Sequence, residues 1–257
     1  MFRLLFSRRW WWTTLLVAAA IAVTVLLGFW QVGRYQVNHA FNNHLDAMQA
    51  APTLDLASAD PAGLTGMEYR AVTAAGNYDL AHQVAIRNQV WEQTWGQDVG
   101  YDLLTPLVLA DGRAVLVDRG WIPLVDGTRA AWAQFDQTGT VHIQGVIRLP
   151  AAPEMGGGVP DPTLAPGQTG LDFWNLVDLK RLQVQIPHPL LPFYIQLSPD
   201  PSQAGLPYRA VPVPEPADDG SNLGYATVWY LFSLLLFFGY PVYLKKQTEG
   251  TSISSKK

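Results

Sequence analysis

Apolar and polar positions alternate in short stretches through the middle of the chain, and one long apolar run lies near each end. The run from Trp10 to Trp30 holds 21 residues without a charge. As a helix it would be about 31 Å long, close to the hydrocarbon thickness of a bilayer. Leu223 to Leu244 is a second uncharged run. The pattern predicts two transmembrane helices, the first of them an uncleaved anchor because it is too long for the apolar region of a signal peptide.

The chain stays favourable for a helix after the first apolar run. Residues from Gln31 to about Met48 are polar but include many good helix formers, so we expect the first helix to continue out of the membrane. Arg34 then lies one turn beyond Trp30, where it can meet lipid headgroups or a bound carboxylate.

Between the two runs, short apolar and β-branched stretches separated by turn residues predict a β-rich domain. The expected strands are Tyr69–Ala75, Tyr78–Asn88, Gly100–Leu109, 114–122, Thr140–Leu149 and Pro192–Ser198, with hairpin turns at Gly76-Asn77 and Asp111-Gly112. A short helix is expected over Asp178–Gln185. Residues 150–170, with five prolines and five glycines, and residues 199–220 are expected to be loops. The triple glycine 156–158 lacks the Lys-Ser/Thr of a phosphate loop and is interpreted as a linker.

The stretch Ala114–Pro123, AVLVDRGWIP, organises this domain. It is expected to be a strand buried on at least one face, in which Gly120 marks a bulge or the close approach of another backbone. Two interpretations stay open. The stretch is a core strand with a bulge, or the bulge turns Asp118 and Arg119 toward a partner or ligand. Trp121 is expected to be buried.

Composition excludes several classes of protein. With no cysteine, disulfides, thiolate metal sites and cysteine nucleophiles are ruled out. A net charge of −4 without a basic stripe argues against nucleic acid as a partner. No catalytic motif is present, and His39 and His44 fall on different faces of a helix, so we expect no catalytic residues and no metal site.

Charges beside the two apolar runs predict the topology. Cationic side chains flank both runs on their outer sides: Arg3, Arg8, Arg9, Lys245, Lys246, Lys256 and Lys257. Both termini are therefore expected in the cytoplasm. The expected division is residues 1–9 in the cytoplasm, 10–33 as the first membrane helix, 34–222 as the extracytoplasmic domain, 223–244 as the second membrane helix and 245–257 as a cytoplasmic tail.

Several blocks follow one another in a recognisable order. They are GFWQVGRYQ (28–36), YRAVTAAGNYD (69–79), RNQ (87–89), GYDLLTPLVLADGRAVLVDRGWIP (100–123), GVIRLP (145–150), FWNLVDL (173–179), PFYIQL (192–197) and NLGYATVWY (222–230). Together they resemble the Surfeit locus protein 1 family over nearly the whole chain. The first block is similar to that family's L-G-x-W-Q-x-x-R signature at the end of the first span.

The expected fold class is an α+β membrane protein, in which two transmembrane helices flank one extracytoplasmic β-rich domain that could take a barrel-like form. The resemblance implies a function without catalysis: assembly of haem-copper cytochrome c oxidase, by assisting haem a delivery to or insertion into subunit I. The implied partners are subunit I of the oxidase, haem a synthase and the lipid bilayer. The implied cofactor is a transient haem a, with none tightly bound.

The resemblance also selects the candidate haem or partner contacts, which are Trp30, Gln31, Arg34, Asn222, Tyr225 and Trp229. We expect the two spans to pack as a pair and to bring the first three close to Tyr225 and Trp229. Asn222 stands where the family often has a histidine, a proposed haem ligand, and an amide is a poor ligand for iron. The simpler interpretation of the aromatic residues is an interfacial belt.

The residues before the first apolar run bear on the membrane in which the protein lies. Nine residues precede the first apolar run without an evident transit peptide, which favours the bacterial plasma membrane over the mitochondrial inner membrane.

The principal alternative function is a non-haem-binding accessory subunit or scaffold stably bound to the oxidase. A small-ligand sensor would need a cytoplasmic output domain, for which residues 245–257 are too short.

Overall fold

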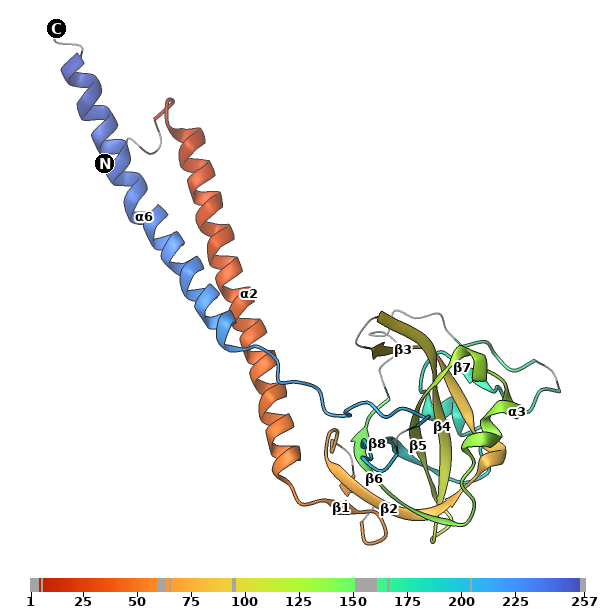
Figure 1. The fold of residues 1–257 in the computed structure, drawn as a ribbon. Helices are drawn as coiled ribbons and strands as arrows, with labels where there is room; N and C mark the ends of the chain where they lie inside the picture. The colour runs from red at the N-terminus through yellow and green to blue at the C-terminus, as the bar shows by residue number, and fades with distance from the viewer. Residues whose placement is uncertain are drawn as a thin grey trace. The chain divides into compact units, whose positions relative to one another are not determined.

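The computed structural model describes residues 5, 7–59, 63–64, 66–93, 96–150, 161–165, 167–203 and 205–254, the side chains of residue 93 and residues 248–254 excepted. The chain forms two compact units. One combines Met1–His44 with Pro216–Lys257, and the other is Leu45–Glu215 (Figure 1). The first unit contains most of α2 (Trp11–Ala50) and the whole of α6 (Gly220–Ser254), and the second contains the end of α2 and the sheet.

The helical unit is built from α2 (Trp11–Ala50) and α6 (Gly220–Ser254), which lie side by side in Figure 1. Both are long and apolar enough to cross a membrane by length and composition. α2 runs 40 residues without a break, so the prediction that it continues past its apolar run is confirmed. Pro241 lies inside α6, near the end of its apolar run.

The two helices pack along a seam with coiled-coil spacing. On α2 one row of partly or fully buried positions has a spacing of three or four residues: Thr14, Val17, Ile21, Thr24, Gly28, Gln31, Tyr35, Asn38 and Asn42. On α6 the corresponding row is Asn222, Ala226, Trp229, Ser233, Leu236, Tyr240 and Leu244. Small and polar residues make up most of the α2 row, whereas the α6 row combines Asn222, Ala226 and Ser233 with larger side chains.

Contacts along this seam confirm the prediction that the spans pack as a pair. The hydroxyl oxygens of Thr13 and Thr14 lie 2.8 and 2.9 Å from the Tyr240 hydroxyl oxygen. A Cβ added at Gly28 would lie 2.5 Å from the ring of Tyr230. Glycine at that position therefore lets the tyrosine ring lie directly on the backbone of α2.

Among the described residues, eight strands form one sheet. They are β1 (Leu54–Asp55), β2 (Ala71–Tyr78), β3 (Val84–Gln93), β4 (Gly96–Leu109), β5 (Ala114–Pro123), β6 (Thr140–Arg148), β7 (Phe173–Trp174) and β8 (Leu190–Leu197). The strand order is β1-β2-β6-β8-β5-β4-β3-β7. Strand β2 also pairs with β4, so the pairing of β2, β6, β8, β5 and β4 returns to its starting strand. The main core lies on one side of these strands and includes Val72, Leu107, Val117, Ile147 and Phe193.

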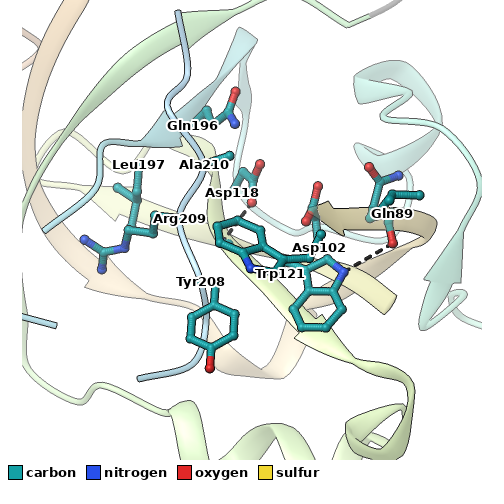
Figure 2. Close-up of a pocket in the computed structure, with 12 residues that line it drawn as sticks. Gln89, Asp102, Asp118, Trp121, Gln196, Leu197, Tyr208, Arg209 and Ala210 are labelled. Carbon is teal, nitrogen blue, oxygen red and sulfur yellow. Dashed lines mark hydrogen bonds between the residues drawn. The ribbon is translucent and has the colours of Figure 1, made fainter. Parts of the chain in front are cut away.

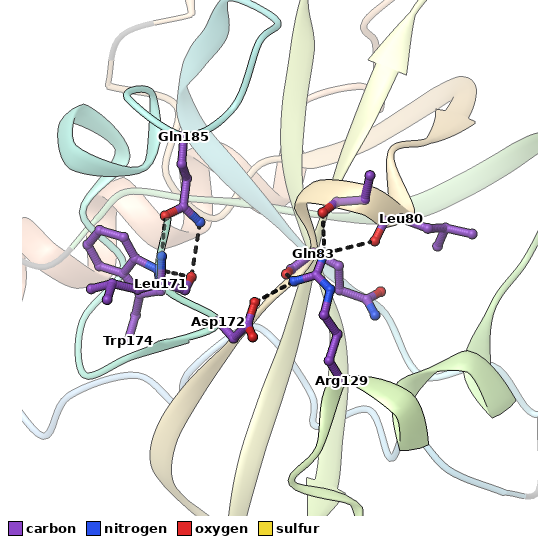
Figure 3. A network of polar contacts seen from close by, with 8 residues as sticks. Leu80, Gln83, Arg129, Leu171, Asp172, Trp174 and Gln185 are labelled. Carbon is purple, nitrogen blue, oxygen red and sulfur yellow. Dashed lines mark hydrogen bonds and ion pairs between the residues drawn. The ribbon is translucent and has the colours of Figure 1, made fainter. Parts of the chain in front are cut away.

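Short helical segments cover the connections between strands. They are η2 (Leu80–His82), η3 (Leu124–Asp126), α3 (Arg129–Trp132), η4 (Ala133–Phe135) and α5 (Leu179–Leu182). Arg129 ties two of the connections together, because its guanidinium donates to the Gln83 carbonyl at 3.2 Å and to the Asp172 carboxylate at 2.5 Å (Figure 3). Gln185 in turn exchanges hydrogen bonds of 2.9 and 3.1 Å with the backbone of Leu171.

The predicted hairpin turn at Gly76-Asn77 is wrong. Both residues lie inside β2, and Gly76 is opposite Val141 of β6 and Leu109 of β4. A Cβ on Gly76 would lie 2.3 Å from the Val108 carbonyl oxygen. Glycine is therefore needed here for the close approach of a second strand rather than for a turn, and the chain reverses later, through Asp79 and η2.

The expected return strand Tyr78–Asn88 is correct only from Val84, where β3 begins, because Tyr78 ends β2 and Leu80–His82 form η2. Most other local predictions are confirmed. The Asp111-Gly112 turn joins β4 to β5, with Gly112 at a φ of +85°. The expected strands at 140–149 and 192–198 correspond to β6 and β8, and the expected short helix contains α5. The triple glycine 156–158 lies outside the described residues.

Candidate functional site

The bulge predicted at Gly120 is present and shapes the middle of β5. Asp102 of β4 is opposite Trp121, whereas Leu104 is opposite Asp118, so β5 holds one extra residue between these pairs. Gly120 has a φ of +119°, and a Cβ there would lie 2.5 Å from the Tyr208 carbonyl oxygen. The backbones of Trp121 and Tyr208 exchange hydrogen bonds of 2.8 and 2.9 Å. A bulge and a close backbone approach therefore occur together.

Arg119 is held by partners inside the domain. Its guanidinium donates to the Gln83 side-chain oxygen at 3.1 Å and to the Phe135 carbonyl, and it lies 4.9 Å from the centre of the Tyr78 ring. The side chain is 4 % exposed, and burial lowers its pKa. These contacts favour the core-strand interpretation for Arg119.

Asp118 instead lines a cavity of about 220 Å³ together with Asp102 (Figure 2). The other lining residues are Gln89, Val90, Trp91, Gly120, Trp121, Gln196, Leu197, Tyr208, Arg209 and Ala210. A second cavity, of about 180 Å³, shares Gln89, Asp102 and Asp118 with the first. The two carboxylates therefore border both spaces.

This carboxylate pair is electrostatically unusual. One carboxylate oxygen of Asp118 accepts the Gly120 N–H at 2.9 Å. The described residues donate no hydrogen bond to its second carboxylate oxygen or to the carboxylate of Asp102. Burial raises the pKa of Asp118 to about 6, although the Gly120 N–H and the charges of Arg148 and Arg209 oppose the shift. Burial, followed by repulsion from Asp118, raises the pKa of Asp102 well above its usual value. The cavity therefore holds acidic groups that carry a proton more readily than surface carboxylates do.

Aromatic rings form one wall of the cavity. Trp121 is 4 % exposed, as predicted, and its indole N–H donates to the Gln89 carbonyl at 3.2 Å. Its ring is nearly parallel to that of Tyr208, with an interplanar angle of 3° and centroids 6.1 Å apart. Trp91 stacks on Tyr208 at 5.3 Å.

Sequence reasoning missed Asp102 and Tyr208. The first was within reach, because the Asp111-Gly112 turn sets a register in which Asp102 is a diagonal neighbour of Asp118 across the hairpin. The second lies in the connector 199–220, and nothing local indicates which backbone approaches Gly120.

In the helical unit, the predicted contact residues mostly meet neighbours on their own helix. The guanidinium carbon of Arg34 lies 5.4 Å from the centre of the Trp30 ring, and the ring centroids of Trp229 and Phe232 are 6.2 Å apart. The Asn222 amide donates to the Asp218 carbonyl at 2.8 Å. Among the described residues, no hydrogen bond or ring contact joins Tyr225 or Trp229 to the three predicted contact residues on α2, which are Trp30, Gln31 and Arg34. Gln31 lies half-buried in the seam, while Trp30 and Tyr225 are exposed.

The helical unit also has polar contacts that sequence reasoning did not single out. Asn38 donates to the Asp218 carbonyl at 2.9 Å, and His39 lies 2.9 Å from the Asp219 carboxylate. Together with Asn42 they hold the segment before α6 against α2. Asn38 and Asn42 lie four residues apart and continue the row of seam positions on α2, which was the available signal.

Comparison with known proteins places this arrangement in a family. The model of the SURF1 family matches residues 18–234, which take in most of α2, the sheet and the first part of α6. A SURF1-like protein of Monosiga brevicollis is 32% identical over 133 residues, covering 49% of this chain and 51% of that protein. Surfeit locus protein 1 of Takifugu rubripes is 28% identical over 140 residues, covering 50% of this chain and 58% of that protein. The chain thus spans about half the length of the curated relatives it matches. Because the family match covers most of its residues, the chain belongs to the SURF1 family.

Proposed function

We propose that this protein is an assembly factor for haem-copper cytochrome c oxidase and carries out no catalytic step of its own. The observation that carries the proposal is the family match over residues 18–234, which includes most of α2, the whole sheet and the first part of α6. In this proposal the protein receives haem a from haem a synthase and assists its delivery to subunit I.

We propose further that α2 and α6 cross a bacterial plasma membrane with both termini in the cytoplasm. Large apolar side chains on the outside of the pair support this placement: Leu16, Leu26, Phe29, Leu235 and Phe238 are each more than half exposed in the isolated chain and would face lipid. A phosphatase fused after Asn88 should then be active, and one fused after Lys257 inactive. An active fusion at the C-terminus would contradict this topology. The closed circuit of strand pairing supports a barrel-like form for the domain between the helices.

In this proposal haem a is cargo rather than a resident cofactor. Trp30 offers an exposed aromatic face to a macrocycle, and Arg34 beside it offers a guanidinium to a propionate. Asn222 cannot take the place of an axial histidine, because an amide is a poor iron ligand and its nitrogen already donates to Asp218. Binding is therefore weak and transient, which suits a delivery step.

The experiment compares Arg34→Ala with Arg9→Ala in a strain that depends on the plasmid-borne protein. Arg9 is a matched control because it also lies over a tryptophan, Trp10, at 5.3 Å. We expect Arg34→Ala to lower haem a in the oxidase without lowering the amount of this protein, and Arg9→Ala to change neither. Asn222→His should increase the haem that copurifies. Normal haem a in the Arg34 variant would contradict the haem-delivery role.

The alternative, a non-haem-binding accessory subunit or scaffold, is favoured by the engagement of Asn222 with Asp218, which leaves no iron ligand at that position. It predicts that the protein copurifies in a fixed ratio with mature oxidase. An assembly factor should instead be found with oxidase intermediates and be absent from the mature complex.

A further inference from the structure

We propose that the cavity beside the β5 bulge binds a monovalent organic cation, an alkylammonium or guanidinium group inserted between the carboxylates of Asp102 and Asp118 and the aromatic wall. The cation could belong to a free small amine or to a lysine or arginine side chain of a partner protein. The purified protein suffices for the test, so its outcome is separate from that of the oxidase assembly assay.

The first observation is an acidic pair without a cationic partner. Asp118 is 7 % exposed, and neither it nor Asp102 forms an ion pair with any described residue. Buried carboxylates are stable when a cation or several hydrogen bonds compensate them, and here the chain supplies the single Gly120 N–H. The second oxygen of Asp118 therefore remains available to a ligand in the cavity.

The nearby arginines are held elsewhere. Arg148 donates to the Gln196 side-chain oxygen at 2.9 Å and to the Pro212 carbonyl at 3.1 Å. Arg209 lines the cavity, but its guanidinium donates to the Ser198 carbonyl at 3.4 Å and points away from both carboxylates in Figure 2. Their charges reach Asp118 only at a distance, so the position next to the carboxylates is open to an external cation.

The aromatic wall selects the kind of cation. Trp91, Trp121 and Tyr208 line the cavity, and aromatic rings attract organic cations through their quadrupoles. A calcium or magnesium ion would need about six or more oxygen ligands. The described residues contain no group of three or more histidine or acidic side chains that could hold a metal ion. The volume of about 220 Å³ is also smaller than the roughly 300–1,000 Å³ of pockets for drug-sized ligands. The head of one side chain fits such a space.

Affinity should depend on pH through the groups that face the pair. These are Asp102 on β4, Asp118 on β5, Tyr194 on β8, Arg148 on β6 and Arg209 on the following connector. Burial raises the pKa of Tyr194 to about 12, so this group stays neutral. Burial raises the pKa of both carboxylates, to about 6 for Asp118, and protonation removes their attraction for a cation.

The test uses the full chain purified in detergent, with methylguanidinium as the probe and saturation-transfer difference NMR as the measurement. We expect saturable binding to the parent protein at neutral pH and affinity about tenfold or more lower in Asp102→Asn and Asp118→Asn. Asp98→Asn, exposed on the same strand β4, is the matched control and should bind as the parent does.

Melting curves show which variants are folded. If Asp118→Asn does not fold, the comparison of Asp102→Asn with the parent protein decides the test. Affinity should also fall as pH is lowered through about 6.

A second arm separates the two sources of the cation. A tripeptide with a central arginine is compared with the same tripeptide containing citrulline. Tighter binding of the arginine peptide than of methylguanidinium assigns the site to a protein side chain, and binding of methylguanidinium alone assigns it to a free small amine. Absence of saturable binding by both probes, or displacement of methylguanidinium by an equal concentration of Ca²⁺, would overturn the proposal.

Discussion

Asn42 and Ala217 exchange two hydrogen bonds, in which the Asn42 amide nitrogen donates to the Ala217 carbonyl and the Ala217 N–H donates to the Asn42 side-chain oxygen, both at 2.8 Å. The asparagine side chain thus pairs with a backbone in the way that a neighbouring strand would. The contact fixes where the chain returns to α2 before α6 begins, so it sets the register of the helix pair at its polar end.

Replacing Asn42 by alanine should loosen this register. The change removes both hydrogen bonds and leaves the partly buried Ala217 groups without their partner, which costs about 1–3 kcal/mol. Asn43→Ala is the control, because residue 43 is exposed and next in sequence. Limited proteolysis in detergent should cut residues 210–220 faster in the Asn42 variant only. Equal cleavage of the two variants would show that the hydrogen bonds between Asn42 and Ala217 do not hold this segment against α2.

Packing in the seam gives a second prediction, from two glycines of the same helix. Gly28 lies against the Tyr230 ring, whereas a Cβ on Gly33 would meet nothing within 4 Å. Gly28→Val should therefore force the helices apart, at a cost of about 1–3 kcal/mol, and Gly33→Val should not. Thermal unfolding in detergent is the measurement. A Gly28 variant as stable as the Gly33 variant would show that the helices do not pack through this point.

Trp121 is expected to be essential for the stability of the sheet unit. Its side chain is buried between β3 and Tyr208, and truncation of a buried aromatic costs about 3–5 kcal/mol. That loss is enough to unfold a domain of ordinary stability. Val90→Ala, at a half-exposed position beside the same cavity, is the control. A Trp121→Ala variant that melts within about a degree or two of the parent would disprove the assignment.

The raised pKa of Asp118 makes stability depend on pH. Between its ordinary value of 3.8 and about 6, the folded state holds a proton that the unfolded state has lost, so stability decreases as pH rises through this window. The total effect is about 3 kcal/mol. Asp118→Asn keeps the acceptor for the Gly120 N–H and removes the titration, so it should be more stable than the parent at pH 8 and less sensitive to pH. Urea unfolding from pH 4 to 8 measures this. An unchanged pH dependence would mean that Asp118 ionises normally.

How far the sequence predicts this structure depends on how local each signal is. The predictions of the two long helices and of the Asp111-Gly112 turn depend only on adjacent residues, and they are confirmed. Gly76-Asn77 carries the same turn signal, but contact with Val108, more than thirty residues away in the chain, keeps it in an extended strand. For the candidate site, Gly120 indicated the bulge. The aromatic wall could not be predicted, because it depends on the path of the irregular connector that brings Tyr208 to Gly120.

We propose that this SURF1-family protein supports assembly of cytochrome c oxidase, and the most direct test is the haem a content of the oxidase in a strain that lacks the chain. Reduced-minus-oxidised spectra of membranes give haem a, and an immunoblot of subunit I gives the oxidase polypeptide. We predict that haem a per subunit I falls when the gene is deleted and recovers when the chain is restored. Haem a and oxidase activity that stay at the parental level in the deletion strain would contradict the claim.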